Sequence, residues 1–318
     1  MGTPFIALQE PTKLDGWVRG KPHDQQVTDA ASTKPAHVPP VFRDAMEVRE
    51  AVFVQEQGVP LEYELDADDP RSCHWVVYAS VNRTTEPERR DPATGAVVAP
   101  RRSVTRSQPV GTLRVVPFPH PPHPRDGGRY VDNVLQPEPE PEPEPEQNLA
   151  GDDQEGEKKT QEPSAPAEEG RRNSQQQQQQ QSSLSGAALP FGPDRATTYH
   201  DGREPYVKIG RMAVVSEFRG HRIAGQLWRA ARGWLEAHPA AFDPSVAELG
   251  MDQLRAAAAS EIPQWRGLVV CHAQADVVPL YERWGFRVDE GMGRWSEEGI
   301  PHVGMALRLD VKKRNPTI

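Results

Sequence analysis

One passage of the chain combines an anion-binding backbone with positive side chains. Residues 209–227 read as an apolar, β-branched run that turns into a helix at 219–222, Arg-Gly-His-Arg. The first N–H groups of a helix have no internal acceptor and carry the positive end of its dipole. Gly220 allows close backbone approach, and Arg219 and Arg222 can donate charged hydrogen bonds. The passage predicts a phosphate or pyrophosphate site, against the plainer interpretation of a strand–helix turn with solvated arginines.

The surrounding periodicities predict the elements that would position this passage. Apolar residues recur at helical spacing in three segments, and β-branched apolar runs separate them. The order helix, strands, helix, strand, helix, strands predicts an α/β domain with a mixed sheet. The predicted helices are 43–57, 222–237 and 277–284, and the predicted strands are 74–79, 110–116, 206–215, 267–272, 286–289 and 302–309.

Composition divides the chain into segments. Residues 117–205 contain consecutive Pro-Glu pairs and a run of seven glutamines, and their 17 acidic and 8 basic residues account for the whole net charge of −9. This segment has too few aliphatic side chains to offset the conformational entropy lost on ordering, and we therefore expect it to be disordered. The predicted segments are a flexible arm that could hold a first strand (1–40), the first half of the domain (41–116), the disordered insert (117–205), the second half (206–310) with a small insert (240–266) that holds a helical piece around 254–261, and a tail (311–318).

Several classes of protein are disfavoured by the same counts. Outside the insert the charges balance, which argues against nucleic-acid binding. No apolar run reaches the ~20 residues of a membrane helix, and the first residues do not read as a signal peptide. Two cysteines, Cys73 and Cys271, give no disulfide framework and suit a reducing compartment. We therefore expect a cytoplasmic or nuclear protein.

Four passages together resemble GNAT N-acetyltransferases. Residues 219–224 resemble the acetyl-CoA pyrophosphate loop, which has Arg or Gln first, Gly fourth and Gly or Ala sixth; here Arg222 stands in the fourth place. Residues 272–286 resemble the second signature, in which a tyrosine precedes Gly-Phe. Residues 49–69 and 296–307 are similar to the opening and ending of the ElaA-like branch. Eukaryotic glucosamine-6-phosphate acetyltransferases share the general pattern.

The resemblance implies a fold and a co-substrate. The GNAT fold is an α/β fold with a mixed central sheet, splayed in the middle and flanked by helices. The pantetheine arm of acetyl-CoA would lie in the gap between strands 206–215 and 267–272, paired with the backbone like an extra strand. An amine would attack the thioester directly in a ternary complex. The implied coenzyme-binding residues are Met212, Ala213, Val214, Arg219, Gly220, His221, Arg222, Ile223, Ala224 and Gln274.

The resemblance also implies a catalytic acid. Tyr281 would protonate the departing thiolate, because a phenol has an ordinary pKa near 10 and a thiol one near 8.5; a plain packing role is the alternative. The general base stays open, since residues 208–215 hold no carboxylate. Glu204, His272 and a relayed water are candidates. The predicted substrate-binding residues are Glu56, Glu64, Asp66 and His272.

Two further interpretations are considered. The carboxylates of residues 62–69 lack the spacing and turn glycine of an EF-hand, so we predict no metal site and a solvated acidic loop that could attract a cationic amine. Cys271 is not needed as a nucleophile in a direct transfer. A catalytically degenerate domain that binds acyl-CoA as a sensor or scaffold is the alternative to the enzyme. The acceptor amine and a homodimer are both left open by the sequence.

Overall fold

The computed structural model describes residues 5–26, 38–137, 194–254, 256–258 and 261–312. Across these ranges twelve strands form one ten-stranded sheet and one two-stranded sheet. The strands are β1 Phe5–Gln9, β2 Cys73–Glu86, β3 Arg89–Arg90, β4 Val97–Ala99, β5 Arg102–Val116, β6 Arg129–Val131, β7 Val134–Leu135, β8 Val207–Val214, β9 Leu268–Gln274, β10 Arg287–Val288, β11 Arg294–Glu297 and β12 Ile300–Arg308. The main helices are α1 Pro40–Arg49, α2 Leu61–Glu64, α4 Ile223–Ala237, α5 Val246–Leu254 and α6 Val278–Glu282.

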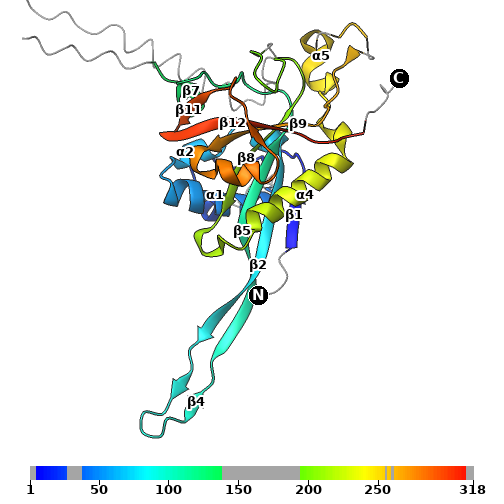
Figure 1. Ribbon diagram of the computed structural model, residues 1–318. Coiled ribbons are helices and arrows are strands. Elements are labelled where there is room, and N and C mark those ends of the chain that lie inside the picture. Colours follow the sequence, from blue (N-terminus) through cyan, green and yellow to red (C-terminus); the bar gives the residue numbers. More distant parts are fainter. Residues whose placement is uncertain (1–4, 27–37, 138–193, 255, 259–260, 313–318) are drawn as a thin grey trace, which may run out of the picture.

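The large sheet has the order β1-β2-β5-β8-β9-β12-β11-β6-β7, and β10 pairs with β12 beside this path. Two neighbouring pairs, β8 with β9 and β11 with β6, are parallel, and the others are antiparallel. The predicted architecture, a mixed sheet flanked by helices and splayed in its middle, is confirmed (Figure 1). β11, which the periodicities do not predict, adds a strand beyond β12.

Helices α1 and α4 cover opposite faces of the sheet. Successive side chains of a strand point to opposite faces. On β2, Trp75 and Val77 join the buried cluster that contains α4 residues such as Leu227. Val76, between them, packs with Ala45 of α1. The sheet is therefore covered on both sides near the strands that flank its centre.

The N-terminal helix is longer than its α-helical part. α1 continues without a break into a π-helical segment, Glu50–Glu56, so the predicted helix 43–57 is one continuous element that begins at Pro40. The predicted arm 1–40 does hold a first strand, since β1 pairs antiparallel with β2. None of the helices in the described ranges is long and apolar enough to cross a membrane.

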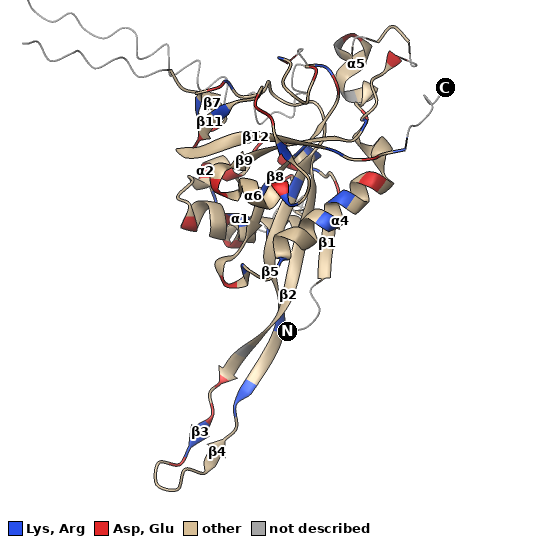
Figure 2. Ribbon diagram, in the orientation of Figure 1, with Lys and Arg blue, Asp and Glu red and all other residues tan. Residues whose placement is uncertain are grey.

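A long hairpin extends from the body of the protein. β2 and β5 continue well past the predicted strands 74–79 and 110–116, and the small β3–β4 sheet lies near the tip (Figure 1). Acidic and basic residues are interspersed along this hairpin (Figure 2). Arg90 pairs with Glu88 and Arg102 with Glu86, all at exposed positions. Polar residues between the two predicted strands thus form a solvated two-stranded ribbon.

Two sequence predictions, one for residues 117–205 and one for residues 240–266, are wrong. The flanks of the predicted disordered insert, 117–137 and 194–205, are built into the domain: β6 pairs with β11, and His123 and His200 are buried. The centre, 138–193, lies outside the described residues. The helix expected around 254–261 instead lies at Val246–Leu254 and is interrupted at Gly250, whose φ is 73°. Composition alone did not show that short polar flanks were held by buried histidines.

Candidate functional site

The sheet opens between β8 and β9. The two strands pair at Val207–Val269, Lys208–Val270 and Ile209–Cys271, and no pairing between them follows. Beyond Ile209, β8 continues along β5, while β9 continues along β12. In the described structure the facing edges of the two strands therefore lack a shared ladder after these three pairs. This leaves backbone groups at the centre of the sheet able to bond a guest.

A bulge in β8 starts where the opening starts. The register with β5 shifts between the partners of Thr112 and Arg114, and Arg211 has a left-handed backbone with φ 47°. A bulge locally bends and twists a strand and re-aims its side chains. Met212–Val214, the residues predicted to pair with a pantetheine arm, follow this bulge. Ala213 is buried against Val48 and Val52, which fixes the strand from the side of the N-terminal helix.

The predicted pyrophosphate loop joins β8 to α4. A turn of 3-10 helix at Ser216–Phe218 leads to Gly220, with φ 80°, and then to Arg222, with φ 61°. Within the described chain, no acceptor is found for the backbone N–H groups of residues 220–225, and the first bond is that of Gln226 N to Arg222 O. A Cβ placed on Gly220 would meet nothing within 4 Å. Free amides and open space at a helix N-terminus suit an anion.

Side chains around this loop are exposed and mostly positive. The rings and guanidinium groups of Arg219, His221 and Arg222 reach solvent, whereas Ile223 anchors the helix in the core. Arg219 binds Glu56 through two contacts of 2.5 and 2.7 Å and donates to the carbonyl of Val214. Glu56, predicted to contact substrate, is thus tied to a residue predicted to contact coenzyme.

Tyr281, on α6, belongs to the main hydrophobic core of the domain. Its side chain is 6% exposed, and its ring makes edge contacts with Trp284 and Phe286 at centroid distances of 5.3 and 5.5 Å. Burial, followed by the neighbouring Cys271, raises the pKa of Tyr281 above its ordinary value. The phenol is therefore neutral at rest, as a thiolate-protonating group must be. Cys271 is fully buried, and burial also raises its pKa, which does not suit a nucleophile.

The acidic loop is not solvated, contrary to the sequence prediction. The side chains of Glu64 and Asp69 are 2% and 0% exposed, and both pair with Arg49, which is also fully buried. Arg114 binds Asp66 and Asp69 at 2.6 and 2.8 Å. Burial alone would raise the pKa of Asp69, but the charges of Arg49 and Arg114 hold it well below its usual range. Paired arginines cancel the negative charge, so the loop fixes the first helix onto the sheet.

Glu64 and Asp66 also meet the bulge. Arg211 lies 3.2 Å from a carboxylate oxygen of each residue. Two of the predicted substrate contacts are therefore placed beside the opening of the sheet, but with their charges already paired. A buried ion network of this kind specifies geometry more than it recognises ligands.

A second polar group lines the other side of the opening. Nδ1 of His272, on β9, lies 2.9 Å from a carboxylate oxygen of Glu297, which also accepts a 2.7 Å hydrogen bond from Trp295. Burial and then Lys208 lower the pKa of His272 to about 4, so its ring is neutral at pH 7. Burial would raise the pKa of Glu297, but His272, His302 and Lys208 lower it below its ordinary value.

Glu297 is the carboxylate that the sequence analysis missed. The expected position was the central strand, and β8 indeed has none. Glu297 comes from β11, a strand that the periodicities did not predict. Gln274, predicted to bind the coenzyme, ends β9 and donates to Gln57 at 3.0 Å, which links the two sides near the end of the π-helical segment.

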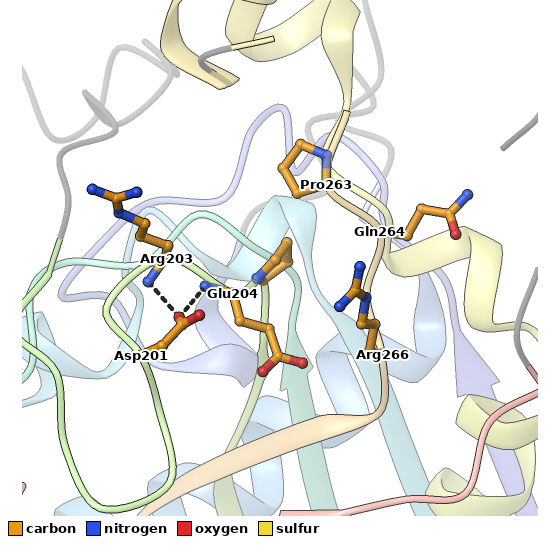
Figure 3. Close-up of a pocket in the computed structure, with 7 residues that line it drawn as sticks. Asp201, Arg203, Glu204, Pro263, Gln264 and Arg266 are labelled. Carbon is orange, nitrogen blue, oxygen red and sulfur yellow. Dashed lines mark hydrogen bonds between the residues drawn. The ribbon is translucent and has the colours of Figure 1, made fainter. Parts of the chain in front are cut away.

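A surface pocket lies away from this opening. Asp201, Glu204 and Arg266 are among its lining residues, and Figure 3 shows the Asp201 carboxylate accepting the backbone N–H groups of Arg203 and Glu204. It contains none of the residues predicted for coenzyme binding, and of the candidates for catalysis it contains only Glu204, whose carboxylate is paired with Arg308 at 2.6 Å. We therefore place the candidate site at the β8–β9 opening.

Comparison with known proteins gives weak similarities. No protein-family model matches the chain, and no curated protein matches it significantly. Similar solved structures include Escherichia coli ElaA, with 14% identity, a TM-score of 0.37 and coverage of 95% of this chain and 99% of that one. Another is an acyl-CoA N-acyltransferase from Pseudomonas aeruginosa, with 15% identity, a TM-score of 0.38 and coverage of 96% and 99%. At these values, the chemistry of the site has to be judged from its own geometry.

Proposed function

We propose that the protein is an acetyl-CoA-dependent N-acetyltransferase of the GNAT type that acetylates a primary amine directly, in a ternary complex. The observation that carries the proposal is the opening between β8 and β9, which leads to a helix N-terminus with unbonded amides. The open edge of β8 would bind an extended, hydrogen-bonding arm, and the N-terminus of α4 would bind a pyrophosphate. Acetyl-CoA has both parts in one molecule.

The loop residues have distinct roles in this proposal. The backbone amides of Gly220 to Ala224 would bind phosphate oxygens, helped by the charges of Arg219 and Arg222. The backbone of Met212–Val214 would bond the arm from the side that β5 leaves free. Gln274 lies across the opening from that strand.

The reaction requires a neutral amine, a stabilised oxyanion and a proton for the leaving group. The amine nitrogen attacks the thioester carbonyl, the C–N bond forms and the C–S bond breaks. Tyr281 would supply the proton to the thiolate. The amine's proton would leave through water or through Glu297, whose carboxylate is ionised and contacts His272 beside the opening.

A specific observation favours the alternative, an acyl-CoA-binding sensor or scaffold without turnover. Arg222 holds a left-handed conformation where the resembled loop has glycine, and Arg219 is already paired with Glu56. Both features would weaken a productive coenzyme pose while permitting binding.

Two measurements on the full chain separate these functions. Calorimetric titration with acetyl-CoA tests the binding site, and detection of free CoA thiol with a panel of amines tests transfer. Binding together with amine-dependent thiol release supports the enzyme. Binding without release on any amine supports the sensor, and absence of acetyl-CoA binding rejects both.

A further inference from the structure

Three side chains from the two flanks of residues 138–193 converge on one point. His123, Asp194 and His200 each offer one ligand atom, and these atoms all lie within 4.8 Å of one another. Nε2 of His123 is 2.9 Å from Nδ1 of His200 and 3.6 Å from a carboxylate oxygen of Asp194. The histidines are 4% and 5% exposed, so the cluster is buried. It is separate from the opening between β8 and β9.

The ring of His200 has its tautomer set by a backbone carbonyl. Its Nε2 lies 2.9 Å from the carbonyl oxygen of Glu204, which can only accept, so Nε2 carries the proton. Nδ1 therefore presents a lone pair to His123 and Asp194. The turn that contains Glu204 is fixed by Asp201, whose carboxylate accepts the backbone N–H groups of Arg203 and Glu204 at 2.8 and 2.7 Å (Figure 3). Histidine ligands of metals are commonly oriented by such an outer hydrogen bond.

Asp194 is held in place by the backbone. One carboxylate oxygen accepts the N–H of His123 at 2.7 Å, and the other accepts the N–H of Arg195 at 2.7 Å. The oxygen nearer His123 Nε2 is thus fixed without a cationic side chain on it. Both histidine rings also pack on Tyr206, at centroid distances of 5.5 and 5.0 Å. The three donors are preorganised, and Asp194, His200 and Tyr206 line a small recess beside the cluster.

From this geometry we propose that His123, Asp194 and His200 bind one divalent transition-metal ion, with Zn²⁺ the best match. Ligand bonds of ~2.0–2.1 Å in a tetrahedron separate the donor atoms by roughly 3.3 Å. The observed separations of 2.9 and 3.6 Å bracket that value. Two imidazoles and one carboxylate are ligands that Zn²⁺ takes readily, and a fourth position would remain for water.

The competing arrangement is a plain hydrogen bond in which Nε2 of His123 donates to Nδ1 of His200. That arrangement leaves the Asp194 oxygen 3.6 Å away with no role beyond the backbone contact.

A bound ion would fasten the two flanks to each other. His123 is 71 residues from Asp194 and 77 from His200 in sequence, so no local motif announces the site. The ion would tie His123, which precedes the β6–β7 hairpin, to Asp194 and His200, which precede β8. A metal that binds the folded chain but not the unfolded one stabilises the fold by its binding free energy.

The test uses full-length protein freed of metal with EDTA and titrated with ZnCl₂ against a chromophoric chelator. We expect one Zn²⁺ per chain, a higher Tm with Zn²⁺, and visible absorption of a tetrahedral Co²⁺ complex. Asp194→Asn and His200→Gln should each lower Zn²⁺ affinity at least ~10-fold. His302→Gln, which removes a buried histidine outside the cluster, should bind as the wild type does.

Metal-free melting curves show whether each variant is folded, and Asp194→Asn keeps the shape of the side chain if His200→Gln fails to fold. Absence of stoichiometric Zn²⁺ binding to the wild type overturns the proposal. Undiminished binding by a folded Asp194→Asn or His200→Gln protein overturns it as well, because the ion would then be held elsewhere.

Discussion

Arg219 and Glu56 form a two-point ion pair across the mouth of the sheet opening, with nitrogen–oxygen distances of 2.5 and 2.7 Å. Their side chains are 45% and 41% exposed, so the pair is screened by solvent. The Glu56 carboxylate binds the guanidinium nitrogens of Arg219 that would otherwise bind the proposed pyrophosphate. Coenzyme binding and this ion pair should therefore compete.

The competition predicts the effect of Glu56→Gln. Freeing Arg219 should tighten acetyl-CoA binding roughly 1.5- to 5-fold, the equivalent of the ~0.2–1 kcal/mol of an exposed ion pair. Arg219→Ala should weaken binding instead. Calorimetric titration measures both, and Glu236→Gln at the far end of α4 serves as the control. Weaker binding by Glu56→Gln would mean that the carboxylate orients the arginine for the coenzyme.

The backbone of Arg222 predicts a stabilising substitution. A left-handed conformation with φ 61° strains any residue that has a Cβ, by about 1–2 kcal/mol, while glycine has no such strain but a more disordered unfolded chain. Arg222→Gly should raise the free energy of unfolding by about 0.5–1 kcal/mol. Arg222→Ala keeps the Cβ and should change it little. Urea denaturation of both variants checks this, and equal shifts would argue against backbone strain.

Tyr281→Phe tests the proposed acid. The ring stays packed between Trp284 and Phe286, so stability should be close to that of the wild type. Loss of the O–H should lower kcat roughly 10²- to 10⁴-fold and leave acetyl-CoA affinity nearly unchanged. Steady-state kinetics paired with a coenzyme titration measure the two effects, with the exposed Tyr199→Phe as control. A normal kcat would remove Tyr281 from the mechanism.

His74 predicts acid sensitivity of the fold. Burial lowers its pKa from 6.5 to about 4, an effect that Asp69 opposes and Arg49 and Arg114 reinforce. As pH falls below 6.5, the unfolded chain takes up a proton before the folded chain does. The free energy of unfolding should therefore fall between pH 6.5 and pH 4 and be constant, for this residue, above that window.

Denaturation at several pH values measures the slope. In His74→Gln the slope between pH 6.5 and pH 4 should be shallower, whereas replacing the exposed His221 by Gln should leave it unchanged. An identical slope in wild type and His74→Gln would assign the acid sensitivity to other groups.

The insert gives a fifth prediction. Replacing only residues 138–193 by a short Gly-Ser linker should preserve the fold and acetyl-CoA binding, and should stabilise the chain by roughly 1 kcal/mol through a shorter loop. Removing 120–200 should instead unfold the protein, because that deletion takes β6, β7 and the buried His123 with it. Circular dichroism and melting curves distinguish the outcomes; loss of fold in the shorter deletion would contradict the composition argument.

Local signals predicted the elements that run through the core. The apolar period of 222–237 gave α4 within one residue, and the β-branched run 206–215 gave β8 within one residue at each end. They failed where long-range partners decide. Glu64 and Asp69 read as solvated until Arg49 and Arg114, distant in sequence, are placed beside them. Glu297 was missed because its strand is short and its importance comes from His272, on another strand.

The opening between β8 and β9 also divides the sheet into two parts, which are joined more firmly on one face than on the other. On the α4 face, one apolar cluster contains residues of both parts, from Leu113 to Met305. On the other side, the buried residues form separate clusters, one around Val76 and another around Leu268. The two parts of the sheet are therefore held together by the shared cluster on the α4 face, whereas the opposite face has no cluster common to both. Amides of β9 and β12 should exchange hydrogen as a unit distinct from β2 and β5. A ligand that contacts both parts should make them exchange as one cooperative unit.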